Sequence, residues 1–164
     1  MKTISDQTPV MLRVARKEIN SPAFATLSFD YSLEFKPGQF VMVWIPGLDE
    51  KPYTISHHRK TEFSITIEAK GLFSKRAVAL EPGDLMGFRG PFGNGFHAVS
   101  SPDVAVVAGG CGMAPLAPLV ESLEKKHGTD QNILFIHGAR SKEFLLHPCR
   151  FDIQRHVCND DGSE

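Results

Sequence analysis

The chain has 164 residues, and 41% of them are hydrophobic, which is enough to bury a core and excludes a disordered or fibrous protein. Its 18 Lys and Arg nearly balance 19 Asp and Glu, with no block of like charges, so a basic stripe for nucleic acid is absent. The longest apolar run, Phe40–Ile45, is far shorter than the roughly 20 residues that cross a bilayer. We expect a soluble, cytoplasmic protein that binds neither nucleic acid nor membrane.

Cysteine and histidine spacing argues against metal chemistry. The three cysteines, Cys111, Cys149 and Cys158, are an odd number, lie far apart and form no Cys-x-x-Cys pair. Only His57 and His58 are adjacent, and neighbouring residues on a strand point to opposite faces. We therefore expect no disulfide scaffold, no iron–sulfur cluster and no metal site in this chain.

Residues 10–96 show the pattern of short strands that Pro-Gly turns interrupt. Residues 25–31 and 63–68 alternate apolar and polar side chains, which predicts strands with one buried and one polar face. Phe40–Ile45 is apolar at every position and predicts a central strand that is buried on both faces. A further strand is expected over residues 85–88. This half predicts a compact antiparallel barrel or sandwich.

The pattern changes after Pro102. A continuous apolar run at residues 104–108, a glycine cluster, a helix-forming stretch at 115–126 and a second apolar run at 133–136 together predict a parallel βαβ unit. Residues 141–146 favour a short helix, and residues 153–157 a third strand. We therefore divide the chain into a β domain, residues 1–100, and an α/β domain, residues 101–164.

The glycine cluster lies where a buried strand meets a helix. Glycines allow a sharp turn and close approach of a ligand, and the helix start offers N–H groups to a pyrophosphate. A plain strand-to-helix turn is the alternative interpretation. The predicted nucleotide-binding residues are Gly109, Gly110, Cys111, Gly112, Met113, Ala114 and Pro115.

Two segments of the β half suggest a second ligand. Ser74 is a candidate N-cap of a helix over residues 74–80, and the neighbouring Lys75 and Arg76 could hold a diphosphate, although a capped surface helix gives the same pattern. Tyr53 and Thr54 could stack on and hydrogen-bond to a cofactor ring, although an ordinary strand has the same composition.

Four motifs occur together in this order: residues 51–54 (KPYT), the loop at 71–74, residues 90–96 (GPFGNGF) and the turn at 109–115. With this set the chain resembles the ferredoxin–NADP reductase superfamily over nearly its whole length. Residues 40–56 and GPFGNGF resemble most the electron-transfer subunits of dihydroorotate dehydrogenase, which serve pyrimidine biosynthesis.

The resemblance implies a Greek-key flavin-binding β-barrel followed by a partial parallel-sheet nucleotide-binding domain, with FAD as the flavin. It places Tyr53 beside the isoalloxazine and Thr54 near its N5 as the catalytic positions. Lys51 takes the place of a more usual Arg, so its diphosphate contact is looser. The remaining FAD positions are Pro52, Ile55, Ser56, Ile67, Glu68, Ala69, Gly71, Leu72, Phe73 and Ser74. NAD(P)H, the substrate, would meet the turn at 109–115 together with Gly138 and Arg140.

The α/β segment departs from the family pattern. Residues 103–164 suffice for one mononucleotide-binding half, so the chain looks truncated at its C-terminus, and the family's four-cysteine [2Fe–2S] site has no counterpart. An uncovered sheet predicts docking to a catalytic dehydrogenase subunit or self-association. The main hypothesis is an FAD-dependent oxidoreductase subunit that passes electrons between NAD(P)H and a partner redox protein. The alternatives are a flavin-binding relay without productive NAD(P)H oxidation and an interaction domain without flavin.

Overall fold

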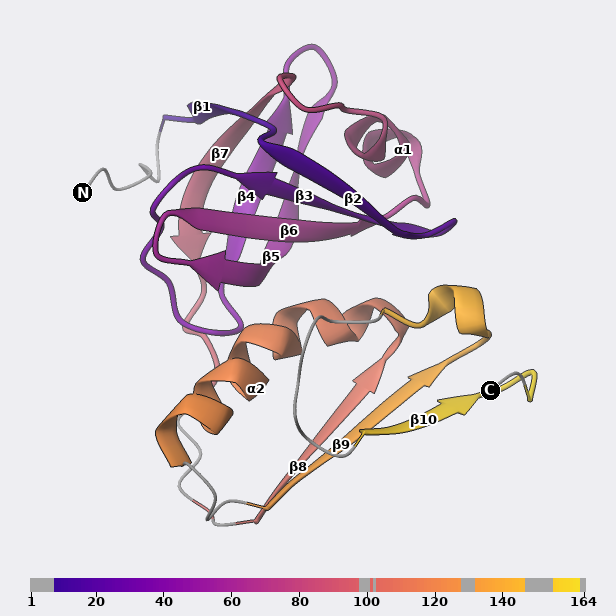
Figure 1. The fold of residues 1–164 in the computed structure, drawn as a ribbon. Coiled ribbons are helices and arrows are strands. Elements are labelled where there is room, and N and C mark those ends of the chain that lie inside the picture. Colours follow the sequence, from indigo (N-terminus) through magenta and orange to yellow (C-terminus); the bar gives the residue numbers. More distant parts are fainter. Residues whose placement is uncertain (1–7, 98–100, 102, 128–131, 147–154, 163–164) are drawn as a thin grey trace.

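The computed structural model describes residues 8–97, 101, 103–127, 132–146 and 155–162. A curled antiparallel sheet and a parallel sheet lie on opposite sides of the long helix α2 (Met113–His127), as Figure 1 shows. Among these described residues no helix is both long and apolar enough to cross a membrane.

The curled sheet has seven strands in the order β1-β7-β4-β5-β6-β3-β2, and every neighbouring pair is antiparallel. It bends into a half-barrel (Figure 1). The antiparallel β architecture that the sequence predicts is confirmed. The strands are β1 (Val10–Arg13), β2 (Arg16–Ser21), β3 (Phe24–Phe29), β4 (Phe40–Ile45), β5 (Asp49–Arg59), β6 (Glu62–Glu68) and β7 (Leu85–Phe92).

The concave face of this sheet holds the larger core. Phe29 stacks on Phe63 at 5.4 Å between ring centroids and meets Phe88 edge-on at 4.6 Å. Burial of each such ring stabilises the fold by about 1.5–3 kcal/mol. Helix α1 (Leu72–Val78), between β6 and β7, adds the buried side chains of Phe73 and Ala77 to this core.

One expectation about strand faces is wrong. On the central strand β4 only Val41, Val43 and Ile45 are buried, whereas the alternate side chains are half-buried because they point to the outer face of the sheet. On β6 the predicted alternation of apolar and polar faces is present, and the polar face is covered as well: Ser64 is only 1% exposed. That covering is possible because helix α2 packs across this side of the sheet, next to β5.

The parallel sheet has the order β10-β9-β8, with β8 (Asp103–Gly109), β9 (Asn132–Ala139) and β10 (Arg155–Asn159). The predicted βαβ unit is confirmed. Its helix begins at Met113, two residues earlier than predicted, because the 3-10 turn η1 (Gly110–Gly112) leads directly into it. Residues 141–146 form only the 3-10 turn η2 (Lys142–Phe144). The third strand lies at Arg155–Asn159, whereas residues 153 and 154 are outside the described part of the chain.

A second apolar core joins the two sheets. Phe24, on β3 of the curled sheet, is buried among Val106, Phe135 and Met113, and it meets Phe144 edge-on at 6.3 Å. The first sheet therefore contributes a side chain to the core of the second part. The opposite face of the parallel sheet carries exposed apolar side chains among the described residues, including Val107, 66% exposed, and Leu134, 43% exposed.

Candidate functional site

Three cavities of similar size lie around the predicted site residues. The first, here the tyrosine cavity, has a volume of about 580 Å³ and lies between β5 and the start of α1. The half-buried ring of Tyr53 forms its wall and stacks on Phe73, with 6.1 Å between centroids and 22° between planes. Burial raises the pKa of the Tyr53 phenol, which keeps it protonated at neutral pH. The cavity is lined by Leu48, Asp49, Lys51, Pro52, Tyr53, Gly71, Leu72, Phe73 and Ser74.

The start of α1 forms the opposite wall of this cavity. The expectation that Ser74 is the N-cap is wrong: Gly71 is the N-cap, and Ser74 lies in the first turn. The Ser74 Oγ accepts hydrogen bonds from the backbone N–H of Lys70 and of Gly71, each at 2.9 Å, which explains the earlier start of the helix. A Cβ added to Gly71 would meet nothing within 4 Å, so its backbone borders open space.

Lys51 supplies the cation of the tyrosine cavity. Its Nζ lies 2.6 Å from Asp49 Oδ2, and both side chains are about half exposed. The hydrogen bond from Lys51, together with one from the backbone, lowers the pKa of the Asp49 carboxyl. An anion that binds Lys51 therefore competes with this carboxylate.

The second cavity, here the turn cavity, lies where the curled sheet meets the ends of β8 and β9 and has a volume of about 560 Å³. An ion pair of 2.9 Å joins Glu68 and Lys70 on the side of the curled sheet. Lys70 lines the turn cavity and the next residue, Gly71, lines the tyrosine cavity, so this segment of the chain takes part in both. The turn cavity is lined by Phe24, Glu68, Lys70, Gly109, Gly110, Cys111, Gly138, Ala139, Arg140, Phe144 and Asp160.

The side chains of the turn cavity are electrostatically coupled. Burial, followed by the negative charge of Glu68, raises the pKa of the Cys111 thiol, which therefore stays protonated at neutral pH. The Arg140 guanidinium lies over the Phe144 ring, 4.6 Å from its centroid. This cation–π contact holds Arg140 at the edge of the cavity.

The structure brings together most, but not all, of the predicted site residues. Lys51, Pro52, Tyr53, Gly71, Leu72, Phe73 and Ser74 line the tyrosine cavity, and Glu68, Gly109, Gly110, Cys111, Gly138 and Arg140 line the turn cavity. Other predicted residues lie elsewhere. Three are core residues, Ile55 and Ile67 in the first core and Met113 in the second, while Ser56 and Ala114 lie beside a third cavity. Thr54 pairs with Phe40 of β4, the Ala69 N–H donates a hydrogen bond to the Ala23 carbonyl, and Gly112 and Pro115 lie at the start of α2.

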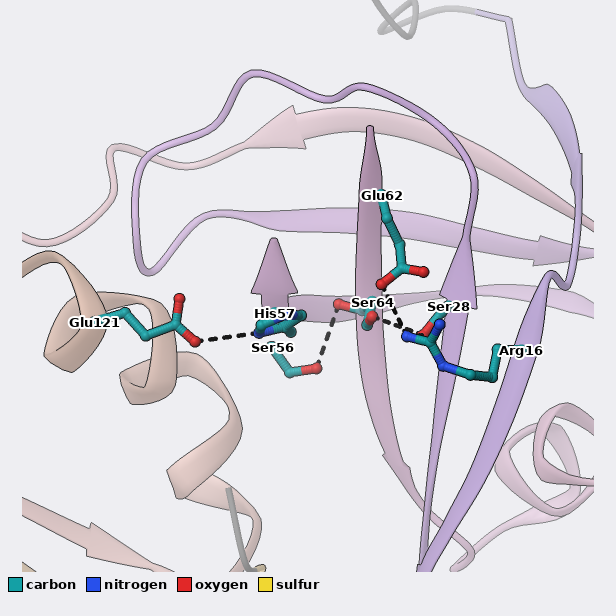
Figure 2. A network of polar contacts seen from close by, with 7 residues as sticks. All are labelled: Arg16, Ser28, Ser56, His57, Glu62, Ser64 and Glu121. Carbon is teal, nitrogen blue, oxygen red and sulfur yellow. Dashed lines mark hydrogen bonds and ion pairs between the residues drawn. The ribbon is translucent and has the colours of Figure 1, made fainter. Parts of the chain in front are cut away.

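The third cavity, here the seam cavity, lies between α2 and the outer face of β2, β3, β5 and β6, with a volume of about 560 Å³. Figure 2 shows its polar network, in which Glu121 from α2 reaches His57 on β5 at 3.1 Å. Across the strands, the Ser28 and Ser64 hydroxyls are 2.9 Å apart, and Arg16 contacts Glu62 at 2.9 Å. The contact between α2 and the curled sheet is thus polar here and apolar at Phe24.

Sequence reasoning missed several of these residues. His57 and Glu121 come together only because α2 folds back on the curled sheet, and no local pattern indicates this. His137 is buried at 0% exposure next to the predicted Gly138, and its alternation with Ile133 and Phe135 on β9 could have placed it on the covered face. Within the described residues, no three His, Cys, Asp or Glu side chains form a group that could hold a metal ion. Cys149 lies outside those residues.

Comparison with protein-family models assigns the chain to a family. The model of the oxidoreductase FAD-binding domain matches residues 12–97, which is more than half of the chain. The chain belongs to this family of FAD-binding oxidoreductase domains. The matched segment contains the whole lining of the tyrosine cavity.

Similar proteins carry a more specific name. The chain is 42% identical over 159 residues to a protein of Methanocaldococcus jannaschii named "Probable dihydroorotate dehydrogenase B (NAD(+)), electron transfer subunit", and the match covers 96% of this chain and 59% of that protein. A protein of the same name from Pyrococcus horikoshii is 40% identical over 140 residues, covering 82% and 51%. The chain thus spans less than two thirds of the length of these relatives.

Solved structures share the fold. An NADH-dependent reduced ferredoxin-NADP oxidoreductase studied for flavin-based electron bifurcation matches with a TM-score of 0.82 at 22% identity, covering 96% of this chain and 59% of that one. Phthalate dioxygenase reductase matches with a TM-score of 0.82 at 15% identity, covering 97% and 55%. The predicted fold class, a β-barrel-type sheet followed by a partial parallel sheet, is confirmed.

Proposed function

We propose that this chain binds FAD on the curled sheet, with the flavin ring against Tyr53 and the diphosphate beside the start of α1. The observation that carries the proposal is the tyrosine cavity itself, in which an aromatic wall faces an open glycine backbone within the segment that matches the FAD-binding family. As at any helix start, the first N–H groups of α1 have no acceptor within the helix. The residues present therefore fit a ring with an anionic tail.

Bound FAD would accept two electrons from a nicotinamide and could pass them one at a time to a partner protein. The chain's own residues hold and orient it. Tyr53 offers a rigid aromatic face, Lys51 offers a cation that must leave Asp49, and Gly71 permits close approach of the tail. We propose Thr54 as the hydroxyl that donates a hydrogen bond to the ring.

We propose further that NAD(P)H binds in the turn cavity. Gly109, Gly110 and Cys111 form one wall, and Arg140 stands at the edge as a cation for a phosphate or ribose. The consecutive residues Lys70 and Gly71 line the turn cavity and the tyrosine cavity respectively, which supports two ligands bound near one another. In this proposal residues 1–100 act as the flavin domain and residues 101–164 as the nucleotide domain.

The biological role we propose is electron transfer between NAD(P)H and a partner redox protein. The names of the similar proteins support a dihydroorotate dehydrogenase catalytic subunit as that partner, and with it a place in pyrimidine biosynthesis. The open face of the parallel sheet at Val107 and Leu134 supports cover by another chain, since parallel sheets are normally covered on both faces.

Anaerobic reduction tests this role. Purified protein loaded with FAD should show a flavin absorption band that bleaches on addition of NADH or NADPH. The alternative that the sequence analysis left open is a flavin relay that does not oxidise NAD(P)H. It predicts a band that dithionite bleaches and both nicotinamides leave unchanged. A protein that takes up no flavin contradicts both and supports an interaction domain.

A further inference from the structure

A buried histidine lies directly behind the glycine turn. His137, on β9, is fully buried, and its ring packs at 6.2 Å from that of Phe135. Its Nε2 lies 3.3 Å from the carbonyl oxygen of Gly110. Because a carbonyl oxygen only accepts hydrogen bonds, this contact requires the proton on Nε2.

The carbonyl that His137 contacts belongs to the residue on which the turn depends. Gly110 has φ of +47°, the left-handed region that other residues rarely adopt, although a Cβ there would meet nothing within 4 Å. The same oxygen accepts the backbone N–H of Met113, the first residue of α2. The Gly110 carbonyl is therefore held by the helix on one side and by the imidazole of β9 on the other.

This double contact links the two walls of the turn cavity. One wall is Gly109, Gly110 and Cys111, and the other is Gly138, Ala139 and Arg140, which follow His137 directly. Gly109 and Gly138 are paired in the parallel register of β8 and β9, but the turn continues beyond the last paired residue. The His137 side chain reaches the turn from β9 past that point and helps to hold it there.

We propose that His137 is a positioning residue for the nucleotide-binding turn, an inference that rests on the proposed binding of NAD(P)H in the turn cavity. It acts through Gly110 and does not line the cavity. Loss of its N–H leaves the Gly110 carbonyl with one donor fewer, so the turn moves more freely and binds a nucleotide less tightly. Electron transfer from a nucleotide that is already bound stays nearly unchanged.

The first experiment examines the turn without any nucleotide. His137→Phe keeps a ring of similar size against Phe135 and removes the donor, whereas His137→Gln keeps an N–H donor near the position of Nε2. We expect the amide of Met113 to exchange its hydrogen about 3- to 10-fold faster in His137→Phe, in line with the net worth of one hydrogen bond, and at nearly the original rate in His137→Gln. His156→Gln, on the exposed part of β10, is the matched control and should change nothing.

The second experiment uses the FAD-loaded chain with NADH. We expect the KM for NADH to rise about 3- to 10-fold in His137→Phe, with the maximal rate of flavin reduction within about 2-fold and with FAD affinity unchanged. His137→Gln should restore the KM. Equal losses in the Phe and Gln variants would show that His137 matters only for packing and would overturn the inference.

The wild-type protein gives a measurement that does not depend on a folded variant. The ¹⁵N shifts of the His137 ring should show a protonated Nε2, and an unprotonated Nε2 overturns the inference. If the wild type binds no NADH, the proposed function fails, and with it the role of His137 in nucleotide binding. The exchange rate of Met113 still decides separately whether His137 holds the turn.

Discussion

The His57 imidazole on β5 lies 3.1 Å from the Glu121 carboxylate on α2, and this hydrogen bond bridges the curled sheet and the helix that follows the glycine turn. Both side chains are largely covered, at 32% and 24% exposure. Phe24 makes the apolar contact between the same two parts. Both polar and apolar contacts therefore hold the helix against the curled sheet.

The Glu121 carboxylate should make stability depend on acid pH. The hydrogen bond from His57 is the largest cause that lowers the pKa of Glu121, and the positive charges of His57, Lys125 and Arg59 add to it against the effect of burial. A group whose pKa is lowered in the fold stabilises it above its ordinary pKa of 4.5 and loses that contribution as pH falls through the lowered value. We expect Glu121→Gln to lower the free energy of unfolding by about 1 kcal/mol at pH 7, with the difference from wild type vanishing in strong acid.

Urea unfolding between pH 7 and pH 2.5 measures this difference. His58, whose pKa burial lowers, adds a loss of stability below its ordinary value of 6.5 in both proteins, because burial is the largest cause of that shift and the charge of Glu121 only a minor one. Glu143→Gln, an exposed carboxylate on η2, is the control and should match wild type. A constant difference between wild type and Glu121→Gln at every pH would contradict the Glu121 carboxylate charge as its source.

Tyr53 should control FAD affinity through its ring. Tyr53→Ala removes the aromatic wall of the tyrosine cavity, so we expect the Kd for FAD to rise about 10-fold or more, given the usual strength of aromatic stacking and area burial. Tyr53→Phe keeps the ring and should bind nearly as well. Quenching of flavin fluorescence gives both values. Leu85→Ala, at another exposed apolar position, is the control, and an equal loss in that variant would argue against a specific contact.

Gly71→Ala should weaken FAD binding while leaving the stability of the fold nearly unchanged. Gly71 has φ of −107° and ψ of −179°, an extended conformation that alanine adopts without strain, and its Cβ would meet no protein atom. We expect the free energy of unfolding to change by less than about 1 kcal/mol. The Kd for FAD should rise, because the new methyl group occupies the space next to the proposed diphosphate. Unchanged affinity would remove the start of α1 from the proposed site.

Ser74→Ala should weaken the start of α1. Its hydroxyl oxygen accepts two backbone N–H groups, so removal should lower the free energy of unfolding by about 1 kcal/mol. Ser74→Thr keeps the oxygen and should remain close to wild type. Thermal unfolding of the three proteins shows the order directly, and a Thr variant as unstable as the Ala variant would point to packing instead.

The sequence predicted the strands and the turn, because these features depend on local residue patterns. The alternation at residues 63–68 and the apolar run before Gly109 located strands, and the glycine cluster located the turn. The Ser74 error is also local, since serine caps a helix either from the N-cap or by reaching back from the first turn, and composition does not distinguish the two.

What the sequence could not predict depends on packing between distant segments. Ser64 was predicted on a polar face, but nothing in the local pattern indicates that this face is buried beside a cavity that helix α2, about 50 residues later, also lines. The turn cavity joins Glu68 to Gly110 and Arg140, which no periodicity relates. The resemblance to a family predicted more of the site residues than the residue patterns did, because it implied which segments of the chain come together at each site.

Titration of the purified chain with FAD tests the central claim most directly. We predict one FAD per chain, saturable binding, quenched flavin fluorescence and a marked loss of affinity in Tyr53→Ala. Failure of the wild-type chain to bind FAD, or binding that neither Tyr53→Ala nor Gly71→Ala weakens, would contradict the proposal that the tyrosine cavity is the flavin site.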